Sequence, residues 1–394
     1  MKQRTSRTLS KIWEHIKNKA PSPACDDDAY MKIALKLAKR GLGNVWPNPA
    51  VGCVLVKENT IIARGWTQPG GRPHAEVEAL TRAGEAAKGA TAYVTLEPCA
   101  HYGKTPPCAN ALVEAGIKRV VIAVEDPDPR VSGQGVKILK DAGIDVTMNV
   151  CREEGIEVNE GFFLKVLKNR PLFTMKMATT LDGKIAVHTG ESQWITEQPT
   201  RQQGHLLRAN HDAIMVGIGT ASEDNPELTC RLPGLEHHSP VRIVVDRRMR
   251  LPLTSKLVTQ AHKIPTWMIT LGDQDAIRAE AYREAGVELI IPDSSSQSEA
   301  GITLDWVAQE LAKRDLTRIL VEGGSHLAAA LLRRKLVDRL CWMRAPRIMG
   351  HDGIPVVQAF GVDHLEETPF FDRTSMFNSG DDLVEIYRRR DFDI

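Results

Sequence analysis

The sequence has almost no net charge, few cysteines, few aromatic side chains and no long apolar run. Its 51 basic and 50 acidic residues leave a formal charge of +1, which provides no strong field to steer the protein onto nucleic acid or anionic lipid. Aromatic residues make up only 5% of the chain, which disfavours a nucleic-acid base editor with a basic, aromatic-studded surface. No stretch approaches the roughly 20 apolar residues that cross a bilayer, and no apolar signal-peptide core begins the chain. We therefore expect neither nucleic acid nor membrane as a partner.

Seven cysteines are too few, and odd in number, for the disulfide framework of a small secreted domain. They are Cys25, Cys53, Cys99, Cys108, Cys151, Cys230 and Cys341. This usage fits a reducing compartment, so we expect a cytoplasmic protein. Two of the thiols stand in a pattern that suggests a metal site. Those without partners in the sequence are expected to be structural, and they are Cys53, Cys151, Cys230 and Cys341.

The length of 394 residues predicts two or three domains, and the 42% share of hydrophobic residues is that of an ordinary folded protein. Residues 1–25 form a basic, Ser/Thr-containing tail with apolar residues at near-helical spacing. We expect a tail or short helix there, and a transit peptide is an alternative, because such segments are rich in Arg and Ser and poor in acidic residues.

Strands alternate with short helices along the rest of the chain, and we find no internal repeat. The break Asn169-Arg170-Pro171 predicts a boundary, with one domain over residues 26–171 and a second over 172–394. The predicted helices cover residues 30–40, 74–85, 107–115, 135–141, 155–168, 199–209, 274–285, 303–314 and 326–334. The predicted strands cover 51–56, 61–65, 92–96, 119–124, 146–150, 172–177, 213–217, 242–246, 266–270, 287–291, 318–322, 339–344 and 382–388. Such alternation is typical of layered α/β domains with helices packed on a sheet.

One imidazole and two thiols in the first domain suggest a catalytic zinc site. His74 opens a predicted helix, Cys99 follows Pro98 at a strand end, and Cys108 starts another helix. Together they supply three of the four tetrahedral ligands of zinc, and a fourth position left to water is what separates a catalytic site from a structural one. Thiols near helix N-termini are further stabilised as thiolates.

Glu76 is the informative residue beside these ligands. A zinc-bound water has a pKa near 7, so it is a nucleophile at neutral pH, but amidine hydrolysis also needs protons delivered to a ring nitrogen and to the leaving amine. A carboxylate that does not ligate the metal could carry them. The order His-x-Glu followed by Pro-Cys is that of zinc nucleobase deaminases, although eight residues separate the two cysteines here instead of two.

Each part of this pattern has an ordinary alternative. His-x-Glu is a common triplet, and two cysteines nine positions apart are more often small buried hydrophobes. The combination with PNPAVGC over residues 47–53 favours the metal site. His101 is a rival ligand, but its neighbours suit a loop that contacts substrate.

The second domain contains a lysine in an otherwise apolar strand. Lys176 shares a strand face with Thr174 and Ala178 by the two-residue period, and a buried ammonium without a partner is costly, so it should face a cleft. Downstream, Glu322-Gly323-Gly324-Ser325 joins a strand to a helix, a geometry whose free N–H groups bind phosphate. By itself this turn is a plain strand–helix connection, and the dinucleotide fingerprint G-x-G-x-x-G is absent.

At this point the motifs resemble a known family. WPNPAVGCVLV (residues 46–56), HAEVEAL (74–80) and TLEPCAHYGKTPPC (95–108) are similar to the deaminase half of the bifunctional riboflavin-biosynthesis deaminase–reductases. GESQWIT (190–196), VGIGTASEDNPELTCR (216–231), VEGG (321–324) and APRIMG (345–350) resemble their reductase half. The resemblance implies an N-terminal cytidine-deaminase-like three-layer α/β domain and a C-terminal dihydrofolate-reductase-like α/β domain.

The resemblance also implies an activity and its residues. Zinc-dependent deamination of 2,5-diamino-6-(5-phosphoribosylamino)pyrimidin-4-one would precede NADPH-dependent reduction of its ribosyl group to ribityl. We also expect a homo-oligomer. The implied zinc ligands and proton shuttle are His74, Cys99, Cys108 and Glu76. The implied substrate contacts are Asn48, His101 and Lys104 in the first half and Lys176, Ser192, Arg208, Leu228, Arg231 and Glu322 in the second. The implied NADPH contacts are Ala178, Trp194, Thr220, Asp224 and the turn over residues 324–330, which begins with Gly324 and Ser325.

Two positions depart from the family pattern. Trp46 stands where a small residue is usual and could reshape the pocket rim. Arg247 stands after Asp246 where a hydroxyl residue is usual, and it could grip the 2′-phosphate of the cofactor or lie on the surface. Arginines otherwise suit a sugar phosphate because the guanidinium is planar. An alternative for the whole chain is an active deaminase whose reductase half is only a scaffold or oligomerisation module.

Overall fold

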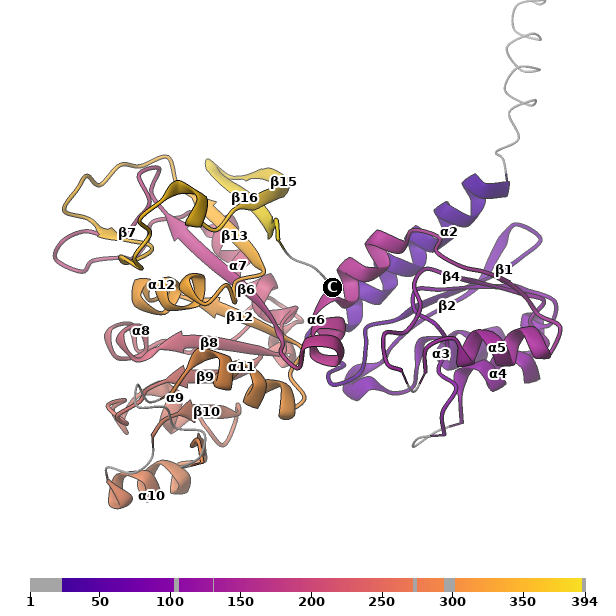
Figure 1. The fold of residues 1–394 in the computed structure, drawn as a ribbon, viewed down its shortest axis with the longest axis horizontal. Coiled ribbons are helices and arrows are strands. Elements are labelled where there is room, and N and C mark those ends of the chain that lie inside the picture. The colour runs from indigo at the N-terminus through magenta and orange to yellow at the C-terminus, as the bar shows by residue number, and fades with distance from the viewer. Residues whose placement is uncertain (1–22, 103–105, 130, 272–274, 294–301, 392–394) are drawn as a thin grey trace, which may run out of the picture. The chain divides into compact units, whose positions relative to one another are not determined.

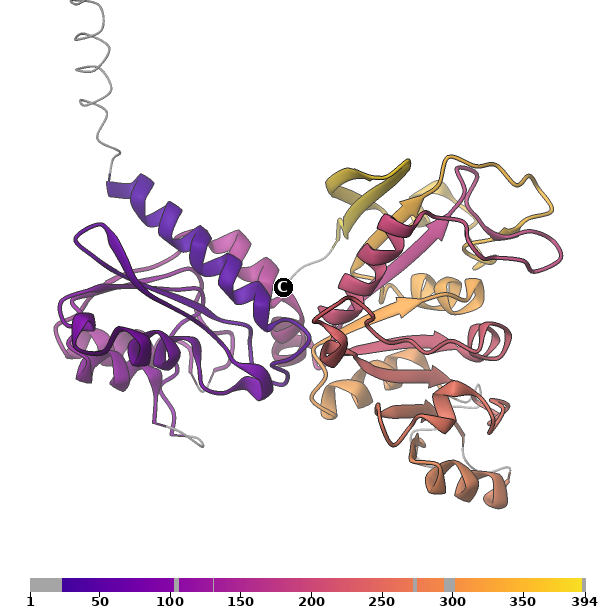
Figure 2. The same cartoon turned by 180° about the vertical axis from the view of Figure 1, so that it is seen from behind.

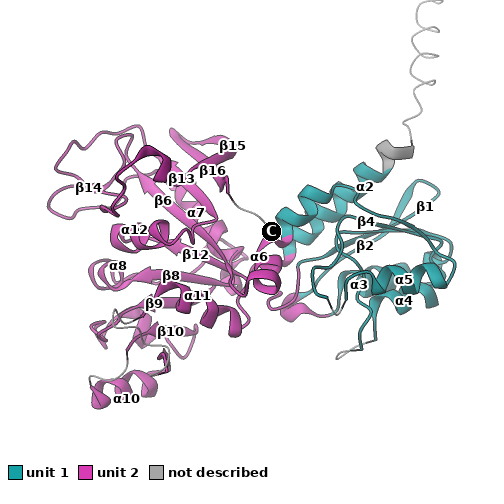
Figure 3. Cartoon of the chain, in the orientation of Figure 1, with its two compact units in different colours: residues 1–40, 50–68, 73–158 teal, residues 41–49, 69–72, 159–394 magenta. Residues whose placement is uncertain are grey.

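The computed structural model describes residues 23–102, 106–129, 131–271, 275–293 and 302–391. The chain forms two compact units (Figure 3). Unit 1 comprises Met1–Arg40, Ala50–Gln68 and Pro73–Val158, and unit 2 comprises Gly41–Pro49, Pro69–Arg72 and Asn159–Ile394. The predicted tail over residues 1–25 lies almost wholly outside the described residues. The division near Pro171 remains a proposal.

Unit 1 is built on a five-stranded sheet in the order β2-β1-β3-β4-β5. The strands are β1 (Gly52–Lys57), β2 (Thr60–Trp66), β3 (Thr91–Val94), β4 (Arg119–Ile122) and β5 (Asp145–Thr147). The first hairpin is antiparallel, and β3, β4 and β5 run parallel to one another. The parallel strands need helical crossovers, which is why strands and helices alternate along this part of the sequence.

Helices cover both faces of this sheet (Figures 1 and 2). They are α2 (Pro23–Ala38), α3 (Ala75–Ala83), α4 (Cys108–Glu114) and α5 (Gln134–Asp141). Helix α2 lies on one face, and α3, α4 and α5 lie together on the other. The close packing of α3 depends on Gly65, because a Cβ atom there would stand 2.2 Å from the carbonyl oxygen of Ala75. Unit 1 is therefore the three-layer α/β domain that the sequence predicts.

Unit 2 contains a nine-stranded sheet in the order β11-β10-β9-β8-β12-β6-β13-β16-β15. The strands are β6 (Leu172–Thr179), β8 (Ala213–Gly217), β9 (Val241–Val245), β10 (Thr266–Ile269), β11 (Val287–Ile290), β12 (Arg318–Glu322), β13 (Arg339–Arg344), β15 (Phe371–Ser379) and β16 (Asp382–Arg389). Pairing is parallel from β11 through β13, and β16 and β15 add an antiparallel edge. The short strands β7 (Lys184–Ala186) and β14 (Ile354–Pro355) form a separate pair.

Alternating residues of these strands build two cores, one on each face. Phe173, Met175 and Met177 of β6 pack in the core that includes residues of α11 (Leu304–Lys313) and α12 (Ser325–Arg333). The opposite core receives Ile214 and Val216 of β8. Its helices are α7 (Gln198–Ala209), α8 (Ile218–Asp224), α9 (Lys256–Thr259) and α10 (Ala276–Glu284). The period of two is what places polar strand residues of β6 away from the α11–α12 side.

Helix α6 (Arg152–Lys168) contributes to both units, since the division falls between Val158 and Asn159. Its second half carries Glu160, whose side chain is fully buried. This carboxylate forms ion pairs with Arg339 of β13 and with Arg388 of β16, the latter with Nε at 3.0 Å. The buried charge is thus neutralised by arginines of the nine-stranded sheet.

The sequence prediction misses several elements. Helix α8 lies in a run rich in Gly, Ser and Asp, where propensity disfavours helix, and the buried side chain of Ala221 anchors it in the core. Strand β15 is exposed over most of its length, so it shows no apolar alternation. Among the described residues, no helix combines the length and the apolarity that a membrane crossing requires.

Candidate active sites

The three predicted metal ligands converge in unit 1. The side-chain donor atoms of His74, Cys99 and Cys108 all lie within 4.8 Å of one another. Nδ1 of His74 is 3.2 Å from Sγ of Cys108 and 3.7 Å from Sγ of Cys99. Tetrahedral ligands at the usual Zn–N and Zn–S bond lengths are separated by about 3.5 to 3.8 Å. The donor set therefore fits a zinc ion in both chemistry and spacing.

Helix starts position these ligands. His74 is the N-cap of α3, and Cys108 is the first residue of α4. The backbone N–H of Cys108 donates to Sγ of Cys99 at 3.3 Å, and the N–H of Ala109 donates to the Cys99 carbonyl oxygen at 3.2 Å. These two hydrogen bonds hold the two ends of the connection between Cys99 and Cys108 close together at the metal site.

Glu97 and Gly135 support the loop that carries Cys99. The buried carboxylate of Glu97 accepts the backbone N–H groups of Asp126, Gly133 and Val136 at 3.3, 3.0 and 3.1 Å. A Cβ atom on Gly135 would stand 2.0 Å from the Pro98 carbonyl oxygen. Helix α5 can therefore pack this closely against the loop only because residue 135 is glycine. Neither residue is predicted from the sequence, although Glu97 stands two positions before Cys99.

Burial and a hydrogen bond between the two thiols set the protonation of the metal site. Glu76 is 3% exposed, and burial raises its pKa to about 7 against the opposing effect of His74. A hydrogen bond from the Cys108 thiol, followed by one with His74, lowers the pKa of Cys99 to about 4 despite burial. The pKa of Cys108 is raised through the same hydrogen bond, because the pair holds one proton between its sulfurs. A bound cation would favour both thiolates.

The predicted substrate residues of the first half do not form one described cluster. Asn48 belongs to the segment grouped with unit 2, where it lies against Gly71. His101 is exposed on the connection between the two cysteines. Lys104 lies outside the described residues.

In unit 2, Arg208, Glu322 and Lys176 come together from three elements. Arg208 of α7 donates from Nε and Nη2 to the two carboxylate oxygens of Glu322, at 2.7 and 2.8 Å. Lys176 on β6 pairs in register with Glu322 on β12, and its side chain reaches Gly204 of α7. Burial raises the pKa of Glu322, but the charges of Arg208 and Lys176 outweigh it and lower the value to about 2. An ionised carboxylate thus lies on the strand next to Lys176, and the cleft expected in front of this lysine stays a prediction.

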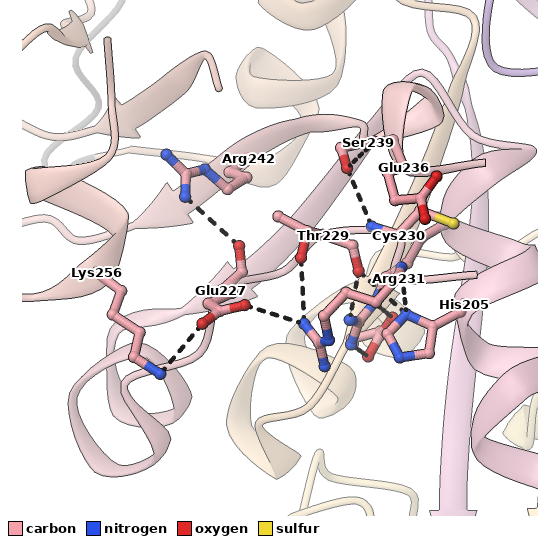
Figure 4. A network of polar contacts seen from close by, with 11 residues as sticks. His205, Glu227, Thr229, Cys230, Arg231, Glu236, Ser239, Arg242 and Lys256 are labelled. Carbon is pink, nitrogen blue, oxygen red and sulfur yellow. Dashed lines mark hydrogen bonds and ion pairs between the residues drawn. The ribbon is translucent and has the colours of Figure 1, made fainter. Parts of the chain in front are cut away.

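The segment from Leu228 to Arg231 contacts this cluster through the backbone of Thr229, and Figure 4 shows Thr229 and Arg231 with their polar neighbours. Arg208 donates from Nη1 to the Thr229 carbonyl oxygen at 3.0 Å. The guanidinium of Arg231 donates to Oγ1 of Thr229 at 3.1 Å and pairs with Glu227. Leu228 is buried in the core, so its side chain anchors the segment. Arg208 and Arg231 thus lie along this segment, and each is paired with a carboxylate, Glu322 and Glu227 respectively.

The predicted cofactor residues follow strand ends. Thr220 of α8 lies against the turn of Gly323 and Gly324, since Cβ atoms there would stand 2.9 and 3.1 Å from its side chain. Ser325 begins α12, and Asp224 ends α8. Adjacent strands β8 and β12 thus deliver these groups at their carboxyl ends, where open α/β sheets bind ligands.

The remaining predicted residues lie on β6 and on the connection to α7. Ala178 is half-buried on the same face as Lys176, and Ser192 is half-buried. The Trp194 side chain is 59% exposed, and the Arg201 guanidinium lies 4.6 Å from its ring centre. Arg247 is an exposed residue after β9.

Sequence reasoning also misses Asp182 and His205. Asp182 accepts the backbone N–H groups of Met349 and Gly350, and a hydrogen bond from Thr180 is the main cause of its pKa of about 2. His205 contacts the Thr229–Arg231 backbone. Both depend on contacts between distant segments, and neither belongs to a recognisable ligand spacing.

Two family models match the chain. The cytidine and deoxycytidylate deaminase zinc-binding region matches residues 25–124, and the RibD C-terminal domain matches residues 171–384. Together with the metal ligands and the second polar cluster, they define a zinc-binding deaminase joined to a reductase in one chain.

Similar proteins share both halves. The riboflavin biosynthesis protein RibD of Aquifex aeolicus is 42% identical over 92% of this chain and 98% of its own length. That of Escherichia coli is 39% identical over 91% and 98%. The crystal structure of a deaminase/reductase from Thermotoga maritima has a TM-score of 0.82 at 35% identity and covers 93% of this chain and 100% of that chain. The chain belongs to the RibD family of bifunctional riboflavin-biosynthesis deaminase–reductases.

Proposed function

We propose that this chain performs two successive reactions on one pyrimidine ribosyl phosphate. Unit 1 would deaminate 2,5-diamino-6-(5-phosphoribosylamino)pyrimidin-4-one, and unit 2 would reduce the product with NADPH. The Thermotoga maritima relative is named as a diaminohydroxyphosphoribosylaminopyrimidine deaminase and 5-amino-6-(5-phosphoribosylamino)uracil reductase. The observation that carries the proposal is one chain with both the His74–Cys99–Cys108 triad and the Arg208–Glu322–Lys176 cluster.

In the first reaction, water adds to the ring carbon that bears the exocyclic amine, and ammonia leaves. Zinc held by His74, Cys99 and Cys108 would supply the Lewis acidity that makes water nucleophilic at neutral pH. Glu76 would take a proton from that water and deliver it to the ring nitrogen, and it would then pass the second proton, from the added hydroxyl, to the leaving amine. The burial of its carboxylate beside the Cys108 thiol supports this role, because a shuttle must hold and release protons readily.

Substrate contacts in the deaminase half are proposed by family resemblance. Asn48, His101 and Lys104 would contact the pyrimidine or its ribose phosphate. The exposure of His101 next to the metal-site connection is compatible with such a contact. Trp46, which packs against the core of unit 2, would also shape the rim of this substrate site.

In the second reaction, C1′ gains a hydride, the C1′–O4′ bond breaks, and O4′ takes up a proton. NADPH would supply the hydride when bound. Arg208 and Arg231 would bind the sugar phosphate through their guanidinium groups, while Lys176 and Glu322 would orient the ribosyl group. Ser192 and the Leu228 backbone would complete the substrate contacts.

NADPH would lie along the carboxyl ends of β6, β8 and β12. The turn of Gly324 and Ser325 supports phosphate binding, because α12 begins there and a Cβ atom would crowd Thr220. Ala178, Trp194 and Asp224 are the further proposed contacts. Arg247 would bind the 2′-phosphate, or it is a surface residue.

One incubation tests both reactions. The full chain, loaded with zinc, is mixed with the diaminopyrimidine phosphate with and without NADPH, and ammonia and NADPH absorbance are followed. We expect one equivalent of ammonia in both mixtures and one equivalent of NADPH oxidised in the second. Ammonia release without NADPH oxidation would contradict the proposed reduction and favour a scaffold role for unit 2. No ammonia release would contradict the deamination.

We also propose that the protein is a homo-oligomer that acts in the cytoplasm. Strand β15 supports self-association, because it is the sheet edge and exposes Met376 and Phe377 at 53% and 41%. The described cysteines assigned as structural are free thiols, which is compatible with a reducing compartment. Light scattering of wild type and Met376→Lys tests the oligomer: a smaller mass for the variant is expected, and a monomeric wild type would contradict it.

A further inference from the structure

His205 lies on α7, one helical turn before Arg208, and a single atom of its ring meets two backbone groups. Nδ1 is 3.1 Å from the Thr229 carbonyl oxygen and 3.3 Å from the backbone nitrogen of Arg231 (Figure 4). A ring nitrogen with a proton donates to the carbonyl, and one without a proton accepts the amide N–H. Nδ1 therefore satisfies one of these two groups at a time.

The neighbouring contacts decide between the two states. The Thr229 carbonyl oxygen already accepts a hydrogen bond from Nη1 of Arg208 at 3.0 Å. With Nδ1 unprotonated, Thr229 keeps that partner and the N–H of Arg231 gains an acceptor. With Nδ1 protonated, the N–H of Arg231 loses this acceptor. The unprotonated state thus satisfies more of the segment's backbone.

The charges around His205 decide whether its ring carries a second proton, whereas the backbone contacts above decide which nitrogen carries the first. Arg208 on α7 and Arg231 on the segment face the ring, and Glu322 on β12 provides a negative charge that is paired with Arg208. Burial, followed by these two arginines, lowers the pKa of His205, which keeps the ring neutral.

The segment itself requires such support. Leu228 has a φ of 55°, a left-handed conformation that is rare for a bulky residue. Two backbone N–H groups that follow are bound by side chains: that of Cys230 donates to Oγ of Ser239 at 3.1 Å, and that of Arg231 donates to His205. Side-chain acceptors therefore fix the course of the chain into Arg231.

We propose that His205 is a positioning residue of the sugar-phosphate site. Its Nδ1 accepts the N–H of Arg231 and so fixes the backbone from which the Arg231 side chain reaches the phosphate beside Arg208. This inference rests on the proposed function, which assigns both arginines to the phosphate.

Steady-state kinetics of three variants test this role. In His205→Asn, a side-chain oxygen replaces Nδ1 as acceptor, whereas His205→Leu has none and His205→Gln places its acceptor near Nε2. The substrates are 5-amino-6-(5-phosphoribosylamino)uracil and its dephosphorylated analogue. We expect His205→Leu and His205→Gln to raise KM for the phosphorylated substrate about fivefold to tenfold with little change in kcat. His205→Asn should restore KM to within about twofold of wild type, and the dephosphorylated substrate should not respond to any variant.

Other results would overturn the inference. Equal losses with both substrates, or a higher KM for NADPH, would indicate a general structural role. An unchanged KM in His205→Leu, or no rescue by asparagine, would remove the positioning role while wild-type activity leaves the proposed function intact. A wild type without NADPH oxidation would instead overturn the proposed function, and this inference with it. If variants fold poorly, ¹⁵N NMR of the wild-type ring decides, since a proton on Nδ1 at neutral pH contradicts the proposal.

Discussion

Arg208 and Glu322 form two parallel hydrogen bonds, and their side chains are only 15% and 11% exposed. The pair joins helix α7 to strand β12. It also keeps the carboxylate ionised beside Lys176, because the opposing charges lower the pKa of Glu322 in spite of its burial. Removal of one partner of such a pair lowers the stability of the protein, because the charge of the other partner stays buried without a counter-charge.

We predict that Glu322→Gln destabilises the protein by about 3 kcal/mol, because Arg208 loses its counter-charge in a buried setting. Chemical denaturation of wild type and variant measures this difference. Asp372→Asn is the matched control, since Asp372 pairs with Arg390 at the exposed sheet edge and its loss should not change stability measurably. Equal effects of the two substitutions would contradict the prediction.

The free energy of unfolding should decrease as the pH is lowered, because His211 is buried in its neutral form. Its ring is 2% exposed, Nδ1 lies 2.6 Å from the Leu207 carbonyl oxygen, and burial lowers its pKa to about 3. The unfolded chain takes up this proton near pH 6.5 and the folded chain does not, so the stability is present above pH 6.5 and is lost as pH falls toward 3. The loss amounts to about 1.4 kcal/mol per pH unit.

His211→Asn should flatten this dependence, because asparagine retains a donor near Nδ1 but does not titrate. Unfolding measured at pH 7, 6 and 5 compares the slopes of wild type and variant. The control is His188→Asn, whose side chain is 68% exposed and should leave the slope unchanged. A variant with the wild-type slope would show that other groups cause the acid sensitivity.

Glu76→Gln should retain zinc and lose ammonia release by about 10²- to 10⁴-fold, because the amide cannot shuttle protons. Metal content by atomic absorption and ammonia release are the two measurements. Glu78→Gln is the control, since Glu78 stands on the same helix and pairs with Arg82. Full activity of Glu76→Gln would remove this residue from the mechanism.

Removal of the metal should separate the two activities. Cys108→Ser, or treatment of wild type with a zinc chelator, should abolish ammonia release, because the donor set loses a thiolate or its ion. NADPH oxidation with the deaminated intermediate should persist. Cys151→Ser, outside the triad, should keep both activities. Loss of both activities after chelation would indicate that zinc supports the fold of the whole chain.

Lys176→Ala should show the reverse pattern. It removes the cation beside Glu322 and should lower NADPH oxidation by about 10²-fold or more while deamination continues. Lys263→Ala, an exposed lysine of the same unit, is the control. Equal losses of deamination and reduction in Lys176→Ala would indicate misfolding.

The alternation of strands and helices was predictable from runs of apolar residues and, on some strands, from a period of two, as Phe173, Met175 and Met177 show on β6. Strand β15 was not predictable in this way, because it buries little and depends on its pairing with β16. Helix α8 depends on tertiary burial of Ala221 in a run with poor helix propensity. Both elements are stabilised by tertiary contacts, which the local sequence pattern does not reveal.

The metal site was predictable because its ligands carry distinctive chemistry at helix starts. The contacts of Glu97 were not, because its partners Asp126, Gly133 and Val136 follow far along the chain. His205 is similar, since its meaning depends on a backbone segment 24 to 26 positions away. The metal ligands could be predicted from their residue types, whereas the residues that position the site could be found only from contacts in the folded structure.

The buried carboxylate of Glu160 determines where a fragment that contains only the reductase half can begin. A fragment begun at residue 171, where the reductase family model starts, would omit it and leave the mostly buried Arg339 and the partly exposed Arg388 without this counter-charge. A fragment begun ahead of α6 would retain it. Independent expression of the reductase half should therefore yield soluble, active material only when the cut precedes that helix.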